Sequence, residues 1–188
     1  IDANNMFAYR VNSHGSLGTI RCSARNCETK DNYVHGMRLG GNYHYNAFGS
    51  NGVSDWVIEH NWASCGDWES IDPNYGSDAG CSADIGFYGD FAPIQRITIT
   101  RNYIAGSNNA LDQGLGPGYC LNPGYYPGKP YPAPNFMTIT DNVFGRGSSN
   151  KCGIFNSTNS LAASGQPLGN IWTNNRYEDG VVIPFPYE

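Results

Sequence analysis

Three ionisable residues, Arg38, Asp84 and Asp112, stand at polar positions of short segments in which polar and apolar residues alternate. Such alternation is typical of strands with one buried face, so we expect the three side chains to point outward from neighbouring strands. Two carboxylates about 5 Å apart repel each other, which raises the pKa of one and lets the pair divide acid and base roles. We therefore predict these three as catalytic residues of a glycoside-cleaving enzyme. The alternative is that both aspartates are solvated surface residues or bind loop amides.

A hydrolase would use one carboxyl to protonate the leaving oxygen while the other attacks or activates water. In a lyase, Arg38 or a tyrosine such as Tyr88 would remove the proton beside a uronate carboxylate, and arginine or Ca²⁺ would stabilise the developing charge. Flat aromatic rings edged by hydrogen-bonding groups suit sugar faces. The rings that we expect to bind substrate are Trp62, Trp68, Tyr88, Tyr125 and Tyr126. The alternative for the tyrosines is packing of their loop against the protein body.

A second acidic group lies in segment 66–80 (GDWESIDPNYGSDAG). Its candidate metal ligands are Asp67, Glu69, Asp72 and Asp78. Carboxylate oxygens on a loop suit Ca²⁺, although this spacing differs from that of an EF-hand. The cofactor expectation is therefore either none or Ca²⁺, and a plain solvated loop is the alternative.

Six cysteines in a chain of 188 residues favour an oxidising compartment. We predict sequential disulfides, Cys22 with Cys27, Cys65 with Cys81 and Cys120 with Cys152, among the several connectivities that six cysteines allow. A metal-thiolate site is the weaker alternative, since the cysteines are scattered and form no CxxC pair. The expected location is secreted or extracellular, or the surface of a virion.

The formal charge of −5 argues against a nucleic-acid partner, which would need a basic surface. No apolar run approaches membrane-spanning length, so we expect no membrane insertion. The expected partner is a polysaccharide or other glycan. A homo-oligomer is a further expectation if the chain is a surface module.

Six related phrases indicate the elements that must position these residues. Each is an alternating run ending at an asparagine, and the phrases cover 8–15, 29–36, 57–64, 99–106, 139–146 and 172–179, with asparagines Asn12, Asn32, Asn61, Asn102, Asn142 and Asn175. Unequal intervals between the phrases indicate one structural coil reused with insertions. An asparagine at a corner tolerates left-handed backbone and can bond to the equivalent amide one coil away.

These features predict an all-β fold, a single-stranded right-handed parallel β-helix with an asparagine corner ladder and long loop insertions. It would form one domain over residues 1–188, with further coils expected upstream. An antiparallel sandwich is the alternative. The first strand of each coil is expected just upstream of its phrase, at 17–21, 36–40, 83–88, 110–115 and 153–157, which would align Arg38, Asp84 and Asp112 on consecutive coils.

Several segments resemble the pectin-lyase-like superfamily, especially secreted and phage-associated proteins of actinobacteria. These are 97–106 (ITITRNYIAG), 136–147 (FMTITDNVFGRG), 151–155 (KCGIF) and 175–184 (NRYEDGVVIP). The resemblance covers most of the chain from about residue 27 and implies a right-handed parallel β-helix and a polysaccharide substrate class. It implies no single reaction, because the superfamily includes lyases, polygalacturonases, tailspikes and adhesins.

Enzyme motifs of that superfamily are mostly missing. Segment 55–64 (DWVIEHNWAS) is similar to a pectate lyase segment, with Glu59 in place of aspartate, but the RxPxxR segment is absent. The paired aspartates and GHG of polygalacturonases are absent as well. We expect an extracellular polysaccharide hydrolase or lyase. The alternatives are a non-catalytic glycan-binding module of phage-tail or adhesin type and a structural filament component.

Overall fold

The computed structural model describes residues 2–15, 20–23, 25–39, 44–65, 68–71, 80–106 and 116–188, with only the backbone described at 2–3, 39 and 68–71. These residues form strands and turns without a helix, and every sheet is parallel. In this part of the chain there is accordingly no helix of the length and apolarity needed to cross a membrane.

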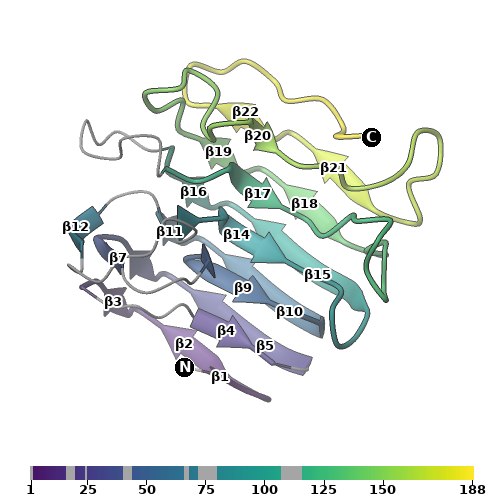
Figure 1. Ribbon diagram of the computed structural model, residues 1–188, viewed down its shortest axis with the longest axis horizontal. Helices are drawn as coiled ribbons and strands as arrows, with labels where there is room; N and C mark the ends of the chain where they lie inside the picture. Colours follow the sequence, from purple (N-terminus) through teal and green to yellow (C-terminus); the bar gives the residue numbers. More distant parts are fainter. Residues whose placement is uncertain are drawn as a thin grey trace.

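Three sheets of six strands make up the body of the protein (Figure 1). Sheet A contains β1 (Asp2–Ala3), β4 (Ile20–Cys22), β9 (Phe48–Ser50), β14 (Ala83–Phe87), β17 (Tyr119–Asn122) and β20 (Asn156–Thr158). Sheet B contains β2 (Phe7–Tyr9), β5 (Arg25–Lys30), β10 (Val53–Glu59), β15 (Ile94–Thr100), β18 (Thr138–Thr140) and β21 (Ile171–Thr173). Sheet C contains β3 (Asn12–Ser13), β6 (Tyr33–Val34), β11 (Trp62–Ala63), β16 (Tyr103–Ile104), β19 (Val143–Phe144) and β22 (Arg176–Tyr177).

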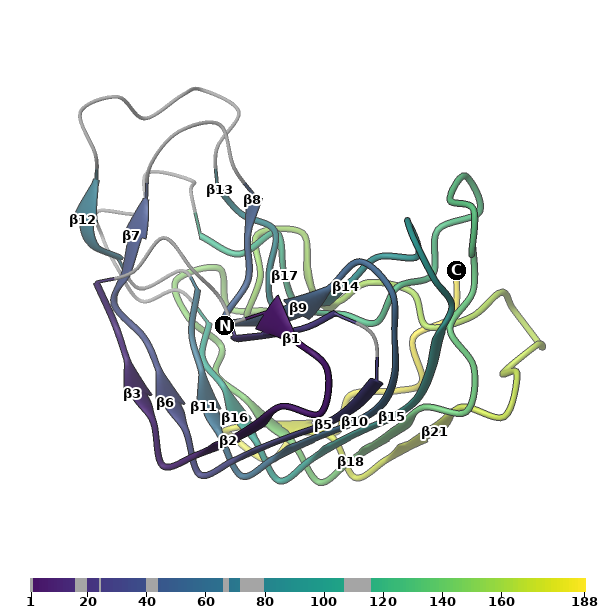
Figure 2. The same cartoon turned by 90° about the horizontal axis from the view of Figure 1, so that it is seen from below.

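The chain passes through sheets A, B and C in that order six times, and one such passage is called a coil below. Figure 2 shows the strands of successive coils stacked side by side around a common interior. Two smaller parallel sheets lie in the insertions of the second and third coils, where β7 (Met37–Leu39) pairs with β12 (Trp68–Ile71) and β8 (His44–Tyr45) pairs with β13 (Gly80–Cys81). This all-parallel arrangement is compatible with a parallel β-helix.

Apolar side chains fill the interior between the three sheets. Ile97 and Ile99 are fully buried, as their alternation with threonine predicts, and Met137 and Ile139 repeat the pattern one coil later. The Trp56 and Phe87 rings pack in a T-shaped arrangement, with 5.9 Å between their centroids. Packing of this kind repeats from coil to coil because parallel pairing keeps equivalent residues in register.

An asparagine ladder runs through the corner between sheets B and C. Its members are at most 3% exposed and are Asn32, Asn61, Asn102, Asn142 and Asn175. Each side-chain amide up to that of Asn142 donates to the carboxamide oxygen of the asparagine in the following coil, at 2.9 to 3.0 Å. The same oxygen accepts a backbone N–H from the preceding coil, and the amide also donates to a backbone carbonyl. The ladder therefore satisfies buried groups that would otherwise lack partners.

Two details of the corner prediction are wrong. Asn12 is not in the ladder: it pairs with Tyr33, and Val11 occupies the corner, donating its N–H to Asn32 Oδ1 at 3.0 Å. The left-handed backbone belongs to the residue before each corner position, with φ between 54° and 59° at Arg10, Asp31, His60, Arg101, Asp141 and Asn174. Since the bend is made one residue earlier, the asparagine side chain points inward, where it can meet the next coil.

The expected first strands are only partly correct. Segment 83–88 coincides with β14, and 17–21 and 153–157 overlap β4 and β20, whereas 110–115 lies outside the described residues. Segment 36–40 is wrong as a sheet A strand, because β7 belongs to an insertion and β9 takes that place. The insertion forms its own paired strands, and their alternation cannot be distinguished by pattern from that of the main sheets.

All three predicted disulfides are confirmed. Cys22 bonds to Cys27, Cys65 to Cys81 and Cys120 to Cys152. The described residues contain no free cysteine. Three disulfides are compatible with an extracellular protein.

Candidate functional site

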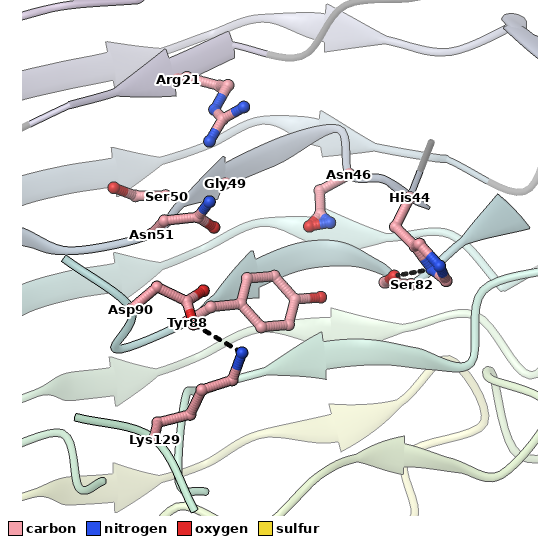
Figure 3. Close-up of a pocket in the computed structure, with 10 residues that line it drawn as sticks. All are labelled: Arg21, His44, Asn46, Gly49, Ser50, Asn51, Ser82, Tyr88, Asp90 and Lys129. Atoms are coloured by element: carbon pink, nitrogen blue, oxygen red, sulfur yellow. Dashed lines mark hydrogen bonds and ion pairs between the residues drawn. The ribbon is translucent and has the colours of Figure 1, made fainter. Parts of the chain in front are cut away.

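The outer face of sheet A is hollowed where two adjacent strands carry glycine. Arg21, Gly49, Gly86 and Asn122 form one row across four neighbouring strands. A Cβ on Gly86 would lie 2.4 Å from Asn46 Oδ1, so only glycine lets Asn46 settle on the strand. The result is a cavity of about 400 Å³ (Figure 3), whose polar lining includes Arg21, His44, Ser82, Tyr88, Asp90 and Lys129.

Tyr88 follows β14 and places its phenol in this cavity. Figure 3 shows the ring pointing back along the strand toward Ser82 and His44. The hydroxyl is buried and has no hydrogen-bond partner among the described residues; the side chains of Ser82 and Asn122 lie near it without reaching bonding geometry. Burial raises the pKa of the Tyr88 phenol, and these two neighbours offset the rise only in part. The phenol is therefore protonated at neutral pH and can donate to a ligand.

A histidine and a serine form a pair beside Tyr88. The two atoms His44 Nδ1 and Ser82 Oγ are 3.1 Å apart, with His44 supplied by β8 and Ser82 by the turn before β14. When Nδ1–H donates to the serine oxygen, the basic lone pair lies on Nε2. In that tautomer, the pair offers a proton acceptor in the same cavity as the Tyr88 phenol, a proton donor, which is the combination that acid–base chemistry requires.

Charged groups line the cavity on two sides. The Lys129 ammonium donates to Asp90 Oδ1 at 2.6 Å, and Figure 3 shows the guanidinium of Arg21 directed into the same space. The two cations suit an anionic ligand. Asp90 is the one carboxylate that lines this cavity within the described part of the chain, and it is held by Lys129. The carboxylate pair that a hydrolase needs is therefore not assembled among these residues.

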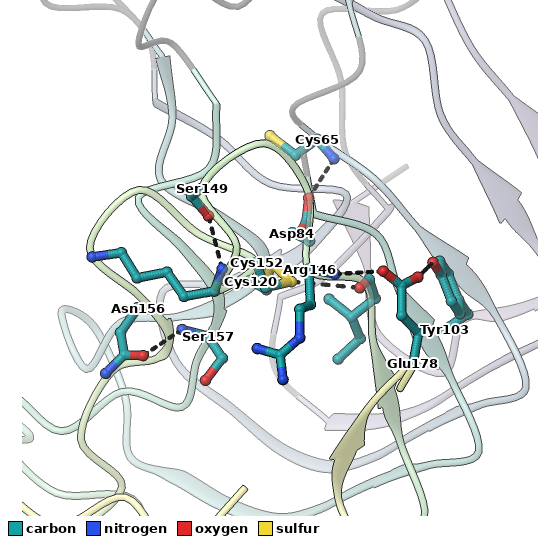
Figure 4. The surroundings of a disulfide bond; sticks show 12 residues. Cys65, Asp84, Tyr103, Cys120, Arg146, Ser149, Cys152, Asn156, Ser157 and Glu178 are labelled. Carbon is teal, nitrogen blue, oxygen red and sulfur yellow. Dashed lines mark hydrogen bonds between the residues drawn. A yellow bond between two sulfur atoms is a disulfide. The ribbon is translucent and has the colours of Figure 1, made fainter. Parts of the chain in front are cut away.

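Asp84 is buried beside Cys65 and does not line the cavity. Its side chain leaves the outward face of β14, as its alternation predicts, but it is fully buried. Its Oδ1 accepts the Cys65 backbone N–H at 2.6 Å, and its carboxylate lies within 4.8 Å of the Cys120 and Cys152 sulfurs (Figure 4). Sulfurs joined in a disulfide are not thiolate ligands, so this cluster is a structural anchor for the insertion.

The expected alignment of Arg38 with Asp84 is not observed. Arg38 lies in β7 and pairs with β12, whereas Asp84 lies in the six-stranded sheet A. The cause is the misplaced first strand of the third coil, since β9 rather than β7 neighbours β14. Asp112 lies outside the described residues.

The remaining predicted residues are divided between the surroundings of this cavity, which is called the groove below, and other surfaces. Tyr126 stacks near Tyr88 with 6.4 Å between ring centroids, whereas Tyr125 donates its hydroxyl to Glu188. Trp62 is on sheet C, 39% exposed, and stacks on Tyr103 at 4.4 Å. For the calcium hypothesis, Asp67, Asp72 and Asp78 lie outside the described residues, and only the backbone is described for Trp68 and Glu69. The calcium site therefore stays a prediction.

Sequence reasoning missed His44, Ser82, Arg21 and Lys129 as groove residues. They come from an insertion, a turn, a strand and a loop of different coils, so no local spacing links them. The available signal was glycine in otherwise apolar strands, at Gly49 and Gly86, because strand glycines often mark a close approach of backbone or ligand.

Comparison of the chain with protein-family models, with curated proteins and with solved structures found no match in any of the three. The chemistry of the groove is therefore argued from its own residues.

Proposed function

We propose that this chain is a right-handed parallel β-helix of the pectin-lyase-like type, is secreted, and cleaves an acidic extracellular polysaccharide by β-elimination in the sheet A groove. Six ordered passages through three parallel sheets and the asparagine ladder support the fold. The proposed reaction rests on one observation. The buried, unpartnered Tyr88 phenol lies beside the His44 and Ser82 pair, in a groove lined by the cationic side chains of Arg21 and Lys129.

The cations define the substrate class. Arg21 and Lys129 suit the carboxylate of a uronate, and a charge-assisted hydrogen bond to that carboxylate would draw electron density from the adjacent carbon. With an uncharged polymer, Arg21 would face no anionic group, whereas Lys129 would keep its bond to Asp90. The groove is open and lies along several coils, which suits a chain rather than a single sugar.

The reaction assigns one proton transfer to each of two side chains. His44 Nε2 takes the proton from C5 of the uronate, and the electrons of that C–H bond form the C4–C5 double bond. The C4–O4 bond breaks, and O4 takes the proton of the Tyr88 hydroxyl to become the hydroxyl of a new reducing end. The imidazolium then returns its proton to the phenolate, directly or through water, so the enzyme is restored and no oxidant is needed.

The raised pKa of Tyr88 decides which role it takes. A phenol protonated at neutral pH is a proton donor rather than the base that the sequence suggested as an alternative. Ser82 acts as a positioning residue, because its hydroxyl fixes the orientation of the His44 ring. Lyase chemistry also fits the single, lysine-bound carboxylate of the groove better than hydrolysis does.

Product analysis tests this proposal. The protein is incubated with polygalacturonate, alginate, hyaluronan and a neutral glucan, while ultraviolet absorbance reports unsaturated ends and a colour assay reports reducing ends. We expect both signals from at least one uronate polymer, and Tyr88→Phe should lower kcat about 100-fold or more. The matched control is Tyr9→Phe, which changes an exposed tyrosine on sheet B, outside the groove. Reducing ends without ultraviolet absorbance would overturn the lyase proposal in favour of a hydrolase.

A second candidate function is glycan binding without cleavage, favoured by an aromatic stack on sheet C. Tyr33 and Trp62 are exposed, and Trp62 stacks on Tyr103 beside a cavity of about 370 Å³. Glycan binding that Trp62→Ala abolishes and Tyr88→Phe leaves intact, with no product from any polymer, would support this candidate instead.

A further inference from the structure

The groove does not end at Tyr88. A second cavity of about 330 Å³ shares His44, Ser82 and Tyr88 with the first. A third, of about 610 Å³, shares Tyr119 and Phe155 with the second. Because neighbouring hollows share lining residues, the three together are called the trough below. It begins over the outer face of sheet A at β4 and ends beside the sixth coil, at β20 and the carboxyl-terminal segment.

The chemistry of the trough changes along its length. Arg21, Asp90 and Lys129 all line the first cavity, and no Asp, Glu, Lys or Arg lines the second or third within the described residues. Aromatic rings line this part of the trough instead. Phe155 is 65% exposed, and its ring centroid lies 5.6 Å from that of Tyr119. Among the described residues this aromatic end offers no Lys or Arg to pair with a carboxylate, so it suits the uncharged faces of sugar rings.

The carboxyl-terminal segment builds the far wall of the trough. After β22 the chain turns back and buries Ile183, whose carbonyl accepts the Trp172 indole N–H at 2.7 Å. The segment then continues across the end of sheet A, where Phe185 and Tyr187 stack at 4.3 Å. Tyr187 also bridges in parallel to Ala162, which fixes this wall to the sixth coil.

We propose that the aromatic end is a binding subsite for sugar rings of the same polysaccharide chain, about two to three units from the bond that is cleaved. This inference rests on the proposed function of the groove. Coils repeat every 4.8 Å or so, so the two coils between Tyr88 and the third cavity span about 10 Å, roughly the length of a disaccharide. A glycan lying along the trough places a charged sugar near Arg21 and stacks a more distant ring on Phe155.

Binding of oligosaccharides of different length tests the subsite. Calorimetry measures the affinity of a galacturonate disaccharide and of the hexasaccharide in a Tyr88→Phe background, which prevents cleavage. Phe155→Ala should weaken hexasaccharide binding about tenfold, the usual size of an aromatic stacking contribution, and leave disaccharide binding unchanged. The control is Phe7→Ala, which removes an equally exposed ring on sheet B, outside the trough.

Salt dependence gives an independent readout. Binding at the charged end should weaken as salt rises, whereas the affinity gained from disaccharide to hexasaccharide should not change. The subsite is refuted if Phe155→Ala and Phe7→Ala bind the hexasaccharide equally well, or if the gain with length disappears in high salt. Cleavage is scored separately in the native chain, so a length-dependent affinity without unsaturated products would refute the lyase proposal and retain the subsite.

Discussion

Replacing one ladder asparagine should destabilise the protein far more than replacing the asparagine that only resembles it. Asn102 donates to the Ile58 carbonyl at 2.9 Å and to the next amide, and its Oδ1 accepts the backbone N–H and the side-chain amide of Asn61 at 2.9 and 3.0 Å. In Asn102→Ala, the Asn61 N–H and the Ile58 carbonyl lose these bonds in the interior. At about 1 to 3 kcal/mol for each buried group without a partner, the loss is about 4 kcal/mol.

The matched control is Asn12→Ala. Asn12 ends an alternating run as Asn102 does, but it is exposed, and its Oδ1 lies 2.9 Å from Nε2 of the half-buried His35. We expect a change within about 0.5 kcal/mol for this variant. Urea denaturation with the disulfides intact measures both free energies of unfolding, and the slope of each transition shows whether the two variants unfold from comparable states. Equal losses for the two variants would refute the assignment of the ladder.

Three further predictions concern pH, a buried carboxylate and the disulfides. Burial, together with a hydrogen bond to Glu178, raises the pKa of Tyr103 from 10.0 to about 12. The contribution of the Tyr103 hydroxyl to stability should therefore be complete below pH 10 and decline as the pH rises toward 12. Denaturation of Tyr103→Phe and of the native chain across this pH range measures that contribution. Asp84→Ala should lower the free energy of unfolding by about 2 kcal/mol, because the buried Cys65 N–H loses its acceptor, and should leave the activity of the folded protein unchanged. Removing Cys120–Cys152, which spans 32 residues, should cost about 4 kcal/mol, against about 2 for Cys22–Cys27, which spans 5.

Each of these has a clear contrary result. A stability difference between Tyr103→Phe and the native chain that stays constant from pH 9 to 13 would contradict the raised pKa. Loss of activity in a fully folded Asp84→Asn variant would show that Asp84 takes part in catalysis, as the sequence suggested. Equal costs for the two disulfides would show that strain or residual structure in the unfolded chain outweighs loop entropy.

The repeated asparagine phrase predicted the parallel architecture because it reflects a requirement of every coil. A buried corner leaves backbone groups without partners, and the same amide satisfies them each time, so Asn32 and Asn142 are recognisable in the sequence. Asn12 misled because it follows an alternating run as the ladder asparagines do, whereas Val11 lies at the corner and donates its N–H to Asn32.

The candidate site was harder to predict because its residues share no period. The outward parity of Tyr88 agrees with its place on the outer face of sheet A, but parity does not reveal that Asp84 is fully buried against the Cys65 backbone. His44 reaches the groove from the β8 strand of an insertion, and Lys129 comes from a loop of a later coil. Their meeting depends on how insertions fold over sheet A, which the alternation of polar and apolar residues does not encode.

The most direct test of the account is the absorbance of unsaturated uronate ends released from an acidic polysaccharide by the native chain and by Tyr88→Phe. The account predicts product from the native chain and a loss of about 100-fold or more when the phenol hydroxyl is removed. Equal product formation by the two proteins, or no unsaturated product from any uronate polymer, would contradict it.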